Sequence, residues 1–508
     1  MTGEAGPDEL ATLAAIQPDA AAWRNLADGS ALSFRAWDAE ANQLARGLIG
    51  RGLKPGDRVV IAVGPDEPFP WLIAYAAAHR AGAVAVPVNT RLAQPELRAI
   101  LSHAEPTVVL AGSDTEAGLW AAEAEPATPR QVIATTGTAG WSAWLDADPS
   151  PLRPTPGEEG GMDIMYTSGT TGAPKAVVVR HPPTDPDSRL PDWNGLGFMT
   201  SSPFSTTSGA LLIYGPMRGG LSGWYQPRFD PGQWLALVET HRPVVTFLVP
   251  AMVQLIVAHP RFEEADLSSL AALTIGGAPV SRATLRRLGG RLPRTDILVG
   301  YGLTEFGAVT RSPSGDRGQH LGSAGTPLPG VEIRIVDAGG AGLPAGQVGE
   351  ITVRGADQPR EYYKAPTGTQ PPWREGWLAS GDLGYLDDDG FLWITGRSKD
   401  IIIRGGHNIT PSEVEEVLYA HPAVVEAVVA GIPHDVLGED VGAWVVLSKG
   451  SDLSADELRA FLRERLADYK VPRRLHFIDQ LPRNASGKVI KAELVMANPA
   501  GSPPGPTP

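Results

Sequence analysis

The segment Tyr166–Lys175 combines the residue types that proteins use to hold phosphate groups. It reads Tyr-Thr-Ser-Gly-Thr-Thr-Gly-Ala-Pro-Lys and follows a predicted strand over 163–166. Glycines allow close backbone approach, N–H groups and hydroxyls donate to anions, and the lysine supplies a countercharge. A Walker-type P-loop is excluded, because the lysine follows Pro174 and precedes Ala176. From these residues alone, a polar surface loop is the alternative.

Four further segments are short, polar and punctuated by glycine. They are Gly276–Pro279, Gly300–Glu305, Ser380–Gly384 and Gly396–Asp400. The first two follow predicted strands, and open α/β sheets bind ligands at the carboxyl ends of parallel strands. Taken singly, each segment also has a plainer reading as an ordinary turn, with Glu305 solvated, Asp382 a turn former and Arg397 a surface charge.

An alternation of helices and strands must position these segments. A helix over 37–53 is predicted by apolar residues spaced along one face, which are Ala41, Leu44, Ala45 and Leu48. Strands over 58–63 and 83–88 flank an alanine-rich helix over 71–80, and this βαβ unit implies a parallel sheet covered on both faces. The alternation continues with helices over 96–103, 251–258 and 281–288 and strands over 107–110, 244–249, 273–275 and 297–299. The predicted fold class is α/β, with a large N-terminal lobe of doubly wound sheets.

After Gly325 the alternation of predicted helices and strands gives way to another pattern. Short β runs over 331–336 and 350–353, with a proline-rich stretch over 359–372, predict a β-rich subdomain. Beyond Arg397, helices over 411–419 and 455–466 and strands over 424–430, 443–447 and 474–477 predict a compact α+β domain. We expect a large domain over 1–398, a small mobile domain over 399–495 and a disordered Pro-, Gly- and Ser-rich tail over 496–508.

Composition and charge exclude several classes of protein. The 508 residues are 42% hydrophobic, enough for a large core, and carry a net charge of −14, which argues against nucleic acid or an anionic membrane as partner. The absence of cysteine excludes disulfides, cysteine–zinc sites and thiol nucleophiles. No secretory signal and no apolar run of about 18 residues is present, so we expect a cytoplasmic protein without a membrane span.

In order and wording, the five glycine-punctuated segments resemble the core motifs of the adenylate-forming superfamily. That superfamily comprises acyl-CoA synthetases, firefly-type luciferases and the adenylation domains of peptide synthetases. The resemblance extends from Leu32 to Lys491, and Tyr166–Lys175 is among its most specific signatures. The segment Arg404–Glu415 is more similar to acyl- and aryl-CoA synthetases than to the peptide-synthetase branch.

The resemblance implies that a carboxylic acid attacks the α-phosphorus of ATP, releases pyrophosphate and forms an acyl-adenylate, which is then transferred to the thiol of coenzyme A. Such chemistry needs prepositioned cations and donors more than a covalent nucleophile. The residues matching the cradle of the β- and γ-phosphates are Thr167, Ser168, Gly169, Thr170, Thr171, Gly172 and Lys175. Thr304 matches the donor to the α-phosphate and Glu305 the ligand of Mg²⁺.

The resemblance also assigns the nucleoside and acid sites. The residues matching the adenine site are Gly277, Ala278, Pro279, Tyr301 and Gly302. Asp382 matches the acceptor of the ribose hydroxyls, and Arg397 matches a ligand of ribose or phosphate. The acid pocket is expected beside Phe204, Gly276 and Gly300.

Lys488, in the sequence Arg-Asn-Ala-Ser-Gly-Lys, matches the catalytic lysine that bridges the substrate carboxylate and the α-phosphate. Lys399 matches the hinge about which the small domain rotates between half-reactions. Rotation would withdraw Lys488 and bring Gly405 and Gly406 toward the acyl-adenylate, opening a tunnel for the thiol.

The sequence departs from the family pattern between Lys175 and Pro203. The expected helix after the phosphate loop is replaced by a proline-rich run over 181–187, and the segment 202–209 lacks a histidine found in many relatives. Loop trimming is one interpretation, and a wider pocket for a bulky or unusual acid is the other. The acceptor stays open between coenzyme A and a carrier-protein thiol, an amine or another nucleophile. The retained Lys488 and Glu305 argue against a non-catalytic relative.

Overall fold

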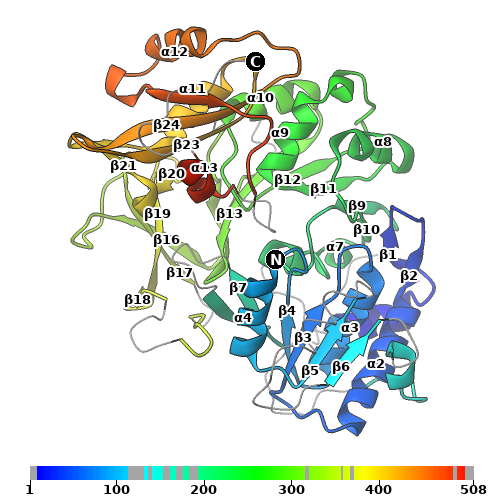
Figure 1. Ribbon diagram of the computed structural model, residues 1–508. Helices are drawn as coiled ribbons and strands as arrows, with labels where there is room; N and C mark the ends of the chain where they lie inside the picture. The colour runs from blue at the N-terminus through cyan, green and yellow to red at the C-terminus, as the bar shows by residue number, and fades with distance from the viewer. Residues whose placement is uncertain are drawn as a thin grey trace.

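The computed structural model describes residues 8–112, 131–135, 140–152, 161–167, 175–181, 193–314, 320–355, 359–365, 371–483 and 489–497. This part of the chain forms four β-sheets flanked by helices (Figure 1). Within the described ranges, no helix combines the length and the apolar character needed to cross a membrane.

The six-stranded sheet contains the predicted βαβ unit. Its strand order is β6-β5-β3-β4-β7-β8, and all neighbours are parallel except the antiparallel pair β7–β8. The strands are β3 (Arg58–Ala62), β4 (Val84–Pro87), β5 (Val108–Ala111), β6 (Gln131–Ala134), β7 (Met162–Thr167) and β8 (Lys175–Arg180). The associated helices are α2 (Phe34–Gly50), α3 (Pro68–Arg80) and α4 (Gln94–Ala104), close to the predicted ranges.

A nine-stranded sheet is the second layer of the large lobe, with the order β15-β14-β13-β12-β11-β9-β10-β1-β2. Its strands are β1 (Ala21–Asn25), β2 (Ala31–Ser33), β9 (Gly197–Thr200), β10 (Ser222–Tyr225), β11 (Val245–Leu248), β12 (Ala272–Ile275), β13 (Asp296–Leu303), β14 (Gly307–Arg311) and β15 (Thr326–Pro327). The helices in this part of the chain are α1 (Asp8–Ile16), α6 (Thr207–Leu211), α7 (Gly215–Arg218), α8 (Pro231–His241), α9 (Pro250–Ala258) and α10 (Arg282–Arg291).

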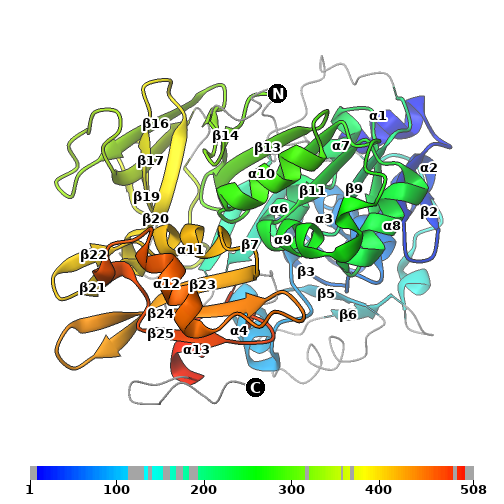
Figure 2. The same cartoon turned by 90° about the horizontal axis from the view of Figure 1, so that it is seen from above.

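Two further sheets complete the described chain. The β-rich subdomain contains β16 (Val331–Val336), β17 (Gly349–Gly355), β18 (Trp373–Arg374), β19 (Trp377–Leu386) and β20 (Leu392–Arg397). The α+β unit contains β21 (Ile402–Arg404), β22 (His407–Ile409), α11 (Pro411–Tyr419), β23 (Val424–His434), β24 (Gly438–Leu447), α12 (Ala455–Arg463), β25 (Arg474–Phe477) and α13 (Lys491–Ala497). Figure 2 shows this unit beside α9 and α10, which contact β23 and α11 respectively.

Two glycine-punctuated segments are strands, where turns were the plain reading. β13 continues through Gly300–Leu303, because these residues pair with β14 in an antiparallel ladder. Ser380–Gly384 lies inside β19, which pairs with β17 and β20. The pairing partners satisfy backbone groups that local sequence would leave to solvent.

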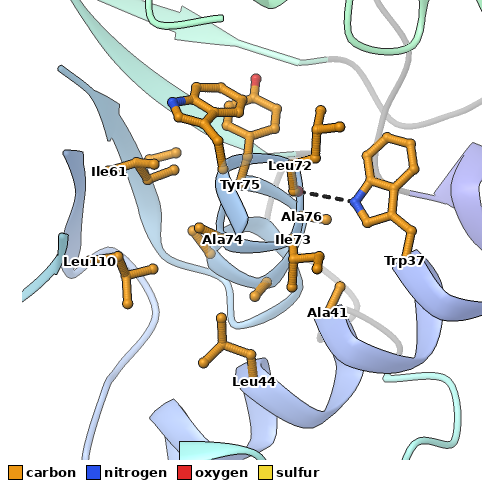
Figure 3. Close-up of a cluster of buried hydrophobic side chains, with 14 of the residues drawn as sticks. Trp37, Ala41, Leu44, Ile61, Leu72, Ile73, Ala74, Tyr75, Ala76 and Leu110 are labelled. Atoms are coloured by element: carbon orange, nitrogen blue, oxygen red, sulfur yellow. Dashed lines mark hydrogen bonds between the residues drawn. The ribbon is translucent and has the colours of Figure 1, made fainter. Parts of the chain in front are cut away.

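The core of the large lobe is built where α2 packs on α3 (Figure 3). The predicted face of α2, with Ala41 and Leu44, is fully buried. Trp37 donates from Nε1 to the carbonyl oxygen of Leu72 at 3.0 Å, so its polar atom is satisfied inside the core. This packing holds α3 against strands β3 and β4.

The helix α2 offers a matched pair of glycines for testing this packing. A Cβ on Gly47 would lie 1.6 Å from the carbonyl oxygen of Trp144, whereas a Cβ on Gly50 would meet nothing within 4 Å. We expect Gly47→Ala to lower the free energy of unfolding by about 1–3 kcal/mol through overpacking. Gly50→Ala should leave it unchanged or raise it by up to about 1 kcal/mol. Urea denaturation followed by circular dichroism would measure both, and equal stabilities would contradict this packing.

Candidate active site

A buried carboxylate lies where the nine-stranded sheet meets the β-rich subdomain. Asp382, on β19, is 5% exposed and accepts hydrogen bonds from the Tyr301 hydroxyl and from Nε of Arg397, each at 2.6 Å. Tyr301 comes from β13, while Asp382 and Arg397 are register partners across β19 and β20. Three residues predicted for the nucleoside site are therefore in direct contact.

The electrostatics of this cluster keep the tyrosine as a donor. Burial, and then the charge of Asp382, raise the pKa of Tyr301. The side chain of Arg397 is 44% exposed, so a guanidinium reaching in from the surface pairs with an interior carboxylate. Asp382 therefore stays close to its two partners while offering its lone pairs to a ligand hydroxyl.

A second cluster follows at the end of β13. The hydroxyl of Tyr362 donates to Oε1 of Glu305 at 2.8 Å, and Nζ of Lys175 donates to the Tyr362 oxygen at 3.3 Å. Tyr362 thus bridges the predicted metal ligand and the predicted phosphate lysine. Burial, with the bond to Glu305, raises the pKa of Tyr362, which keeps its hydroxyl protonated.

Thr304 is held from two sides. Its backbone oxygen accepts from Arg360 at 2.9 Å, and its hydroxyl lies 2.9 Å from that of Thr207. Sequence reasoning missed Thr207, Arg360 and Tyr362. The proline-rich setting of Arg360 and Tyr362 gave no local signal, and each lies more than fifty residues from its partner in the chain.

The ends of the predicted phosphate loop come together as the pair Thr167↔Lys175 of the β7–β8 hairpin. The intervening residues 168–174, with Ser168, Gly169, Thr170, Thr171 and Gly172, lie outside the described part of the chain, as does Lys488.

Gly276, which follows β12, lies beside an aromatic ring and close to the backbone of β13. A Cβ on Gly276 would be 3.5 Å from the ring of Phe247 and 3.6 Å from the carbonyl oxygen of Gly300. Gly277, with φ +90°, adopts a backbone conformation that favours glycine, and Ala278 and Pro279 follow it. Gly276 therefore leaves the space beside the Phe247 ring without a side chain.

Phe204 has other neighbours. Its ring stacks on Tyr225 at 4.6 Å, meets Trp23 edge-on at 5.0 Å and lies 5.3 Å from Trp71. With Tyr225 and Trp71 it lines a small, solvent-open pocket, to which Arg91 also contributes. The predicted pocket residue therefore lines a pocket, but the lining of that pocket does not include Gly276 or Gly300.

The predicted hinge Lys399 and the glycine pair Gly405 and Gly406 both lie in turns. Lys399 lies in the short 3₁₀ turn Ser398–Asp400, between β20 of one sheet and β21 of the next. Gly405 and Gly406 form the turn between β21 and β22, with φ of +56° and +85°.

The geometry brings together the carboxylate of Asp382, which binds hydroxyls, and a second group of side chains: Thr304 and Glu305, just after β13, and Lys175 of β8. Such a site can hold a ligand that has vicinal hydroxyls at one end and an anionic, metal-binding group at the other.

Comparisons with known proteins agree with this reading. The AMP-binding enzyme family matches residues 10–363, and the AMP-binding enzyme C-terminal domain matches residues 413–488. A feruloyl-CoA synthase from Amycolatopsis sp is 36% identical over 504 residues, 95% of this chain and 96% of that protein. A fatty acid–acyl-carrier-protein ligase from Streptomyces coeruleorubidus is 35% identical over 92% of each chain. An anthranilate CoA ligase in complex with anthranoyl-AMP has a TM-score of 0.87 at 25% identity, covering 98% of both chains.

These matches confirm the predicted adenylate-forming chemistry, the fold class with its large and small domains, and the class of AMP-forming acid–thiol ligases, which use ATP and coenzyme A. The chain thus belongs to the AMP-binding enzyme family.

Proposed function

We propose that this enzyme activates an aromatic carboxylic acid with ATP and Mg²⁺ and transfers the acyl group to coenzyme A. The observation that carries the proposal is the contact of Tyr301 and Arg397 with buried Asp382, adjoining the cluster of Glu305 and Lys175. One site thereby offers a nucleoside end and a polyphosphate end.

In this proposal one set of residues binds the ribose of the adenosine and another encloses its adenine. Asp382 accepts from the ribose hydroxyls, and Arg397 binds ribose or phosphate. Tyr301 and Gly302 enclose the adenine together with Gly277, Ala278 and Pro279. A carboxylate suits vicinal hydroxyls because its two oxygens accept two hydrogen bonds side by side.

Glu305 fits the proposed Mg²⁺ ion. Its carboxylate is half-buried and oriented by Tyr362, and hard cations prefer oxygen ligands. When bound, Mg²⁺ neutralises charge on the triphosphate. Thr304 donates to the α-phosphate, and Lys175 with the loop after Thr167 binds the β- and γ-phosphates.

Two observations support an aromatic acid. Gly276 leaves the space beside the ring of Phe247 without a side chain, which suits a flat substrate ring packed there. The relatives include a feruloyl-CoA synthase and an anthranilate CoA ligase, both named for aromatic acids.

Lys488 and the small domain complete the proposed cycle. Lys488 bridges the carboxylate and the α-phosphate during adenylation. The domain over 399–495 then rotates about Lys399, so that the turn of Gly405 and Gly406 faces the acyl-adenylate and the thiol. The position of Lys399 between two sheets supports a hinge there, because no strand pairing among the described residues joins the sheet before it to the sheet after it.

A panel of aromatic and aliphatic acids tests the function. Pyrophosphate release should depend on an aromatic acid, and mass spectrometry should detect its CoA thioester. The carrier-protein ligase relative favours one competing acceptor, so a phosphopantetheinylated carrier protein belongs in the same assay. Pyrophosphate release with no thioester of coenzyme A would contradict the second half of the proposal, and a response to fatty acids alone would contradict the substrate class.

The nucleoside assignment predicts a specific effect of Tyr301→Phe. Losing the hydroxyl that orients Asp382 should raise the KM for ATP about fivefold to tenfold, equivalent to about 1 kcal/mol. Tyr385→Phe is the matched control, because Tyr385 is half-buried on the same strand as Asp382. Steady-state kinetics at saturating acid would measure both, and equal KM values in the two variants would remove Tyr301 from the site.

The proposed role of Lys488 predicts that its loss slows adenylation but not thioester formation. Lys488→Ala should slow acid-dependent pyrophosphate release at least about 100-fold, since it removes a cation from the transition state. Thioester formation from a supplied acyl-adenylate should be unchanged, because Lys488 is withdrawn in that step. The exposed Lys449 supplies the control variant Lys449→Ala. Normal adenylation by Lys488→Ala would refute the assignment.

A further inference from the structure

A buried cluster with no part in the proposed reaction joins α3 to the β7–β8 hairpin. Asp163, at the start of β7, is flanked by His79 of α3 and by His181, which follows β8. Nε2 of His79 lies 2.8 Å from Oδ1 of Asp163, and Nε2 of His181 lies 2.8 Å from Oδ2. The side chains are 2%, 1% and 12% exposed for His79, Asp163 and His181.

We propose that His79, Asp163 and His181 form a binding site for a divalent transition-metal ion of the zinc class. One donor atom from each residue lies within 4.8 Å of the other two. Two imidazole nitrogens with one carboxylate oxygen are a donor set that suits zinc, cobalt and nickel, whereas magnesium and calcium prefer oxygen alone.

The electrostatics of the cluster favour a bound cation. Asp163 is almost completely buried, and its ion-pair partners among the described residues are the two imidazoles. Arg80, the next residue after His79, pairs instead with Asp38. A buried carboxylate needs a compensating charge. A divalent ion provides it while both histidines stay neutral, the form in which they ligate metals.

The surroundings hold the donors in place. The Tyr75 hydroxyl donates to Oδ2 of Asp163 at 2.7 Å, an outer contact of the kind that orients a ligating carboxylate. The backbone N–H of His181 donates to the carbonyl oxygen of Gly161 at 2.8 Å. A Cβ on Gly161 would lie 2.7 Å from the His79 ring, so the glycine allows this close approach. The cluster is thus largely preorganised.

The distances require only a small adjustment. Ligand atoms about 2.0–2.1 Å from a tetrahedral zinc ion lie about 3.3 Å from one another. The observed N–O separations are 2.8 Å, the length of hydrogen bonds, so each donor would move outward by less than an ångström. A water molecule would complete the coordination, with Tyr75 kept as the outer contact of Asp163.

The position in the hairpin indicates a structural role for the ion. Asp163 pairs with Val179, whereas the phosphate-loop ends Thr167 and Lys175 pair at the opposite end of the same hairpin. An ion at Asp163 would fasten the hairpin to α3 and leave the reactive end unobstructed.

Metal analysis of the full chain tests the proposal. The enzyme, with any histidine tag removed, is incubated with Zn²⁺ or Co²⁺, passed through metal-free buffer and analysed by plasma mass spectrometry. We expect one ion per chain, and in the Co²⁺ form visible absorption bands of a nitrogen- and oxygen-ligated ion. Asp163→Asn and His181→Gln should lose the ion. His421→Gln, which changes a partly exposed histidine outside the cluster, should retain it.

Wild-type enzyme that retains no ion and shows no Co²⁺ bands would overturn the proposal and leave a hydrogen-bonded cluster. Retention of the ion by both Asp163→Asn and His181→Gln would also overturn it. If those variants fail to fold, the wild-type stoichiometry and Co²⁺ spectrum decide. These readouts need neither ATP nor an acid, so their outcome is independent of the proposed ligase function.

Discussion

Asp382 is the buried charge on which the arrangement of the large lobe around its site depends. An unpaired carboxylate in the interior costs several kcal/mol, so Tyr301 and Arg397 must stay within hydrogen-bond distance of it. Tyr301 belongs to the nine-stranded sheet, and the other two belong to the β-rich subdomain. The contacts of this one carboxylate therefore link the two sheets, at the place where we propose that a nucleotide binds groups from both.

The bond between Asp382 and Arg397 also affects how the small domain is attached. Arg397 is the last residue of β20, and Lys399 follows in the turn that leads to the next sheet. The bond to Asp382 secures the chain immediately before the proposed hinge, so a rotation would begin at a fixed point. The nucleoside contacts could then persist while the small domain moves.

Sequence patterns predicted the elements well where local periodicity decides them, as in α2 and the strands and helices of the βαβ unit. They were less informative about Gly300–Leu303 and Ser380–Gly384, because glycine-rich composition favours turns while pairing with distant strands makes both segments β. Tyr362 was not predicted from the sequence for a related reason. Its significance comes from contacts with Lys175 and Glu305, which are far away in the chain. Asp382 was singled out only through the resemblance to a family, and its contacts with Tyr301 and Arg397 came from the structure.

One contact of the small domain with the large lobe is exposed. The Glu416 carboxylate of α11 accepts from the backbone N–H of Arg282, at the first turn of α10, at 3.0 and 3.1 Å. Such an exposed contact with a helix N-terminus contributes about 0.3–1 kcal/mol. Asp382 lies buried on the other side of the hinge, where losing a partner costs far more. The proposed rotation about Lys399 would break this exposed contact and spare those of Asp382. The polar groups proposed to bind nucleotide would thus stay in place while the contacts of the small domain change.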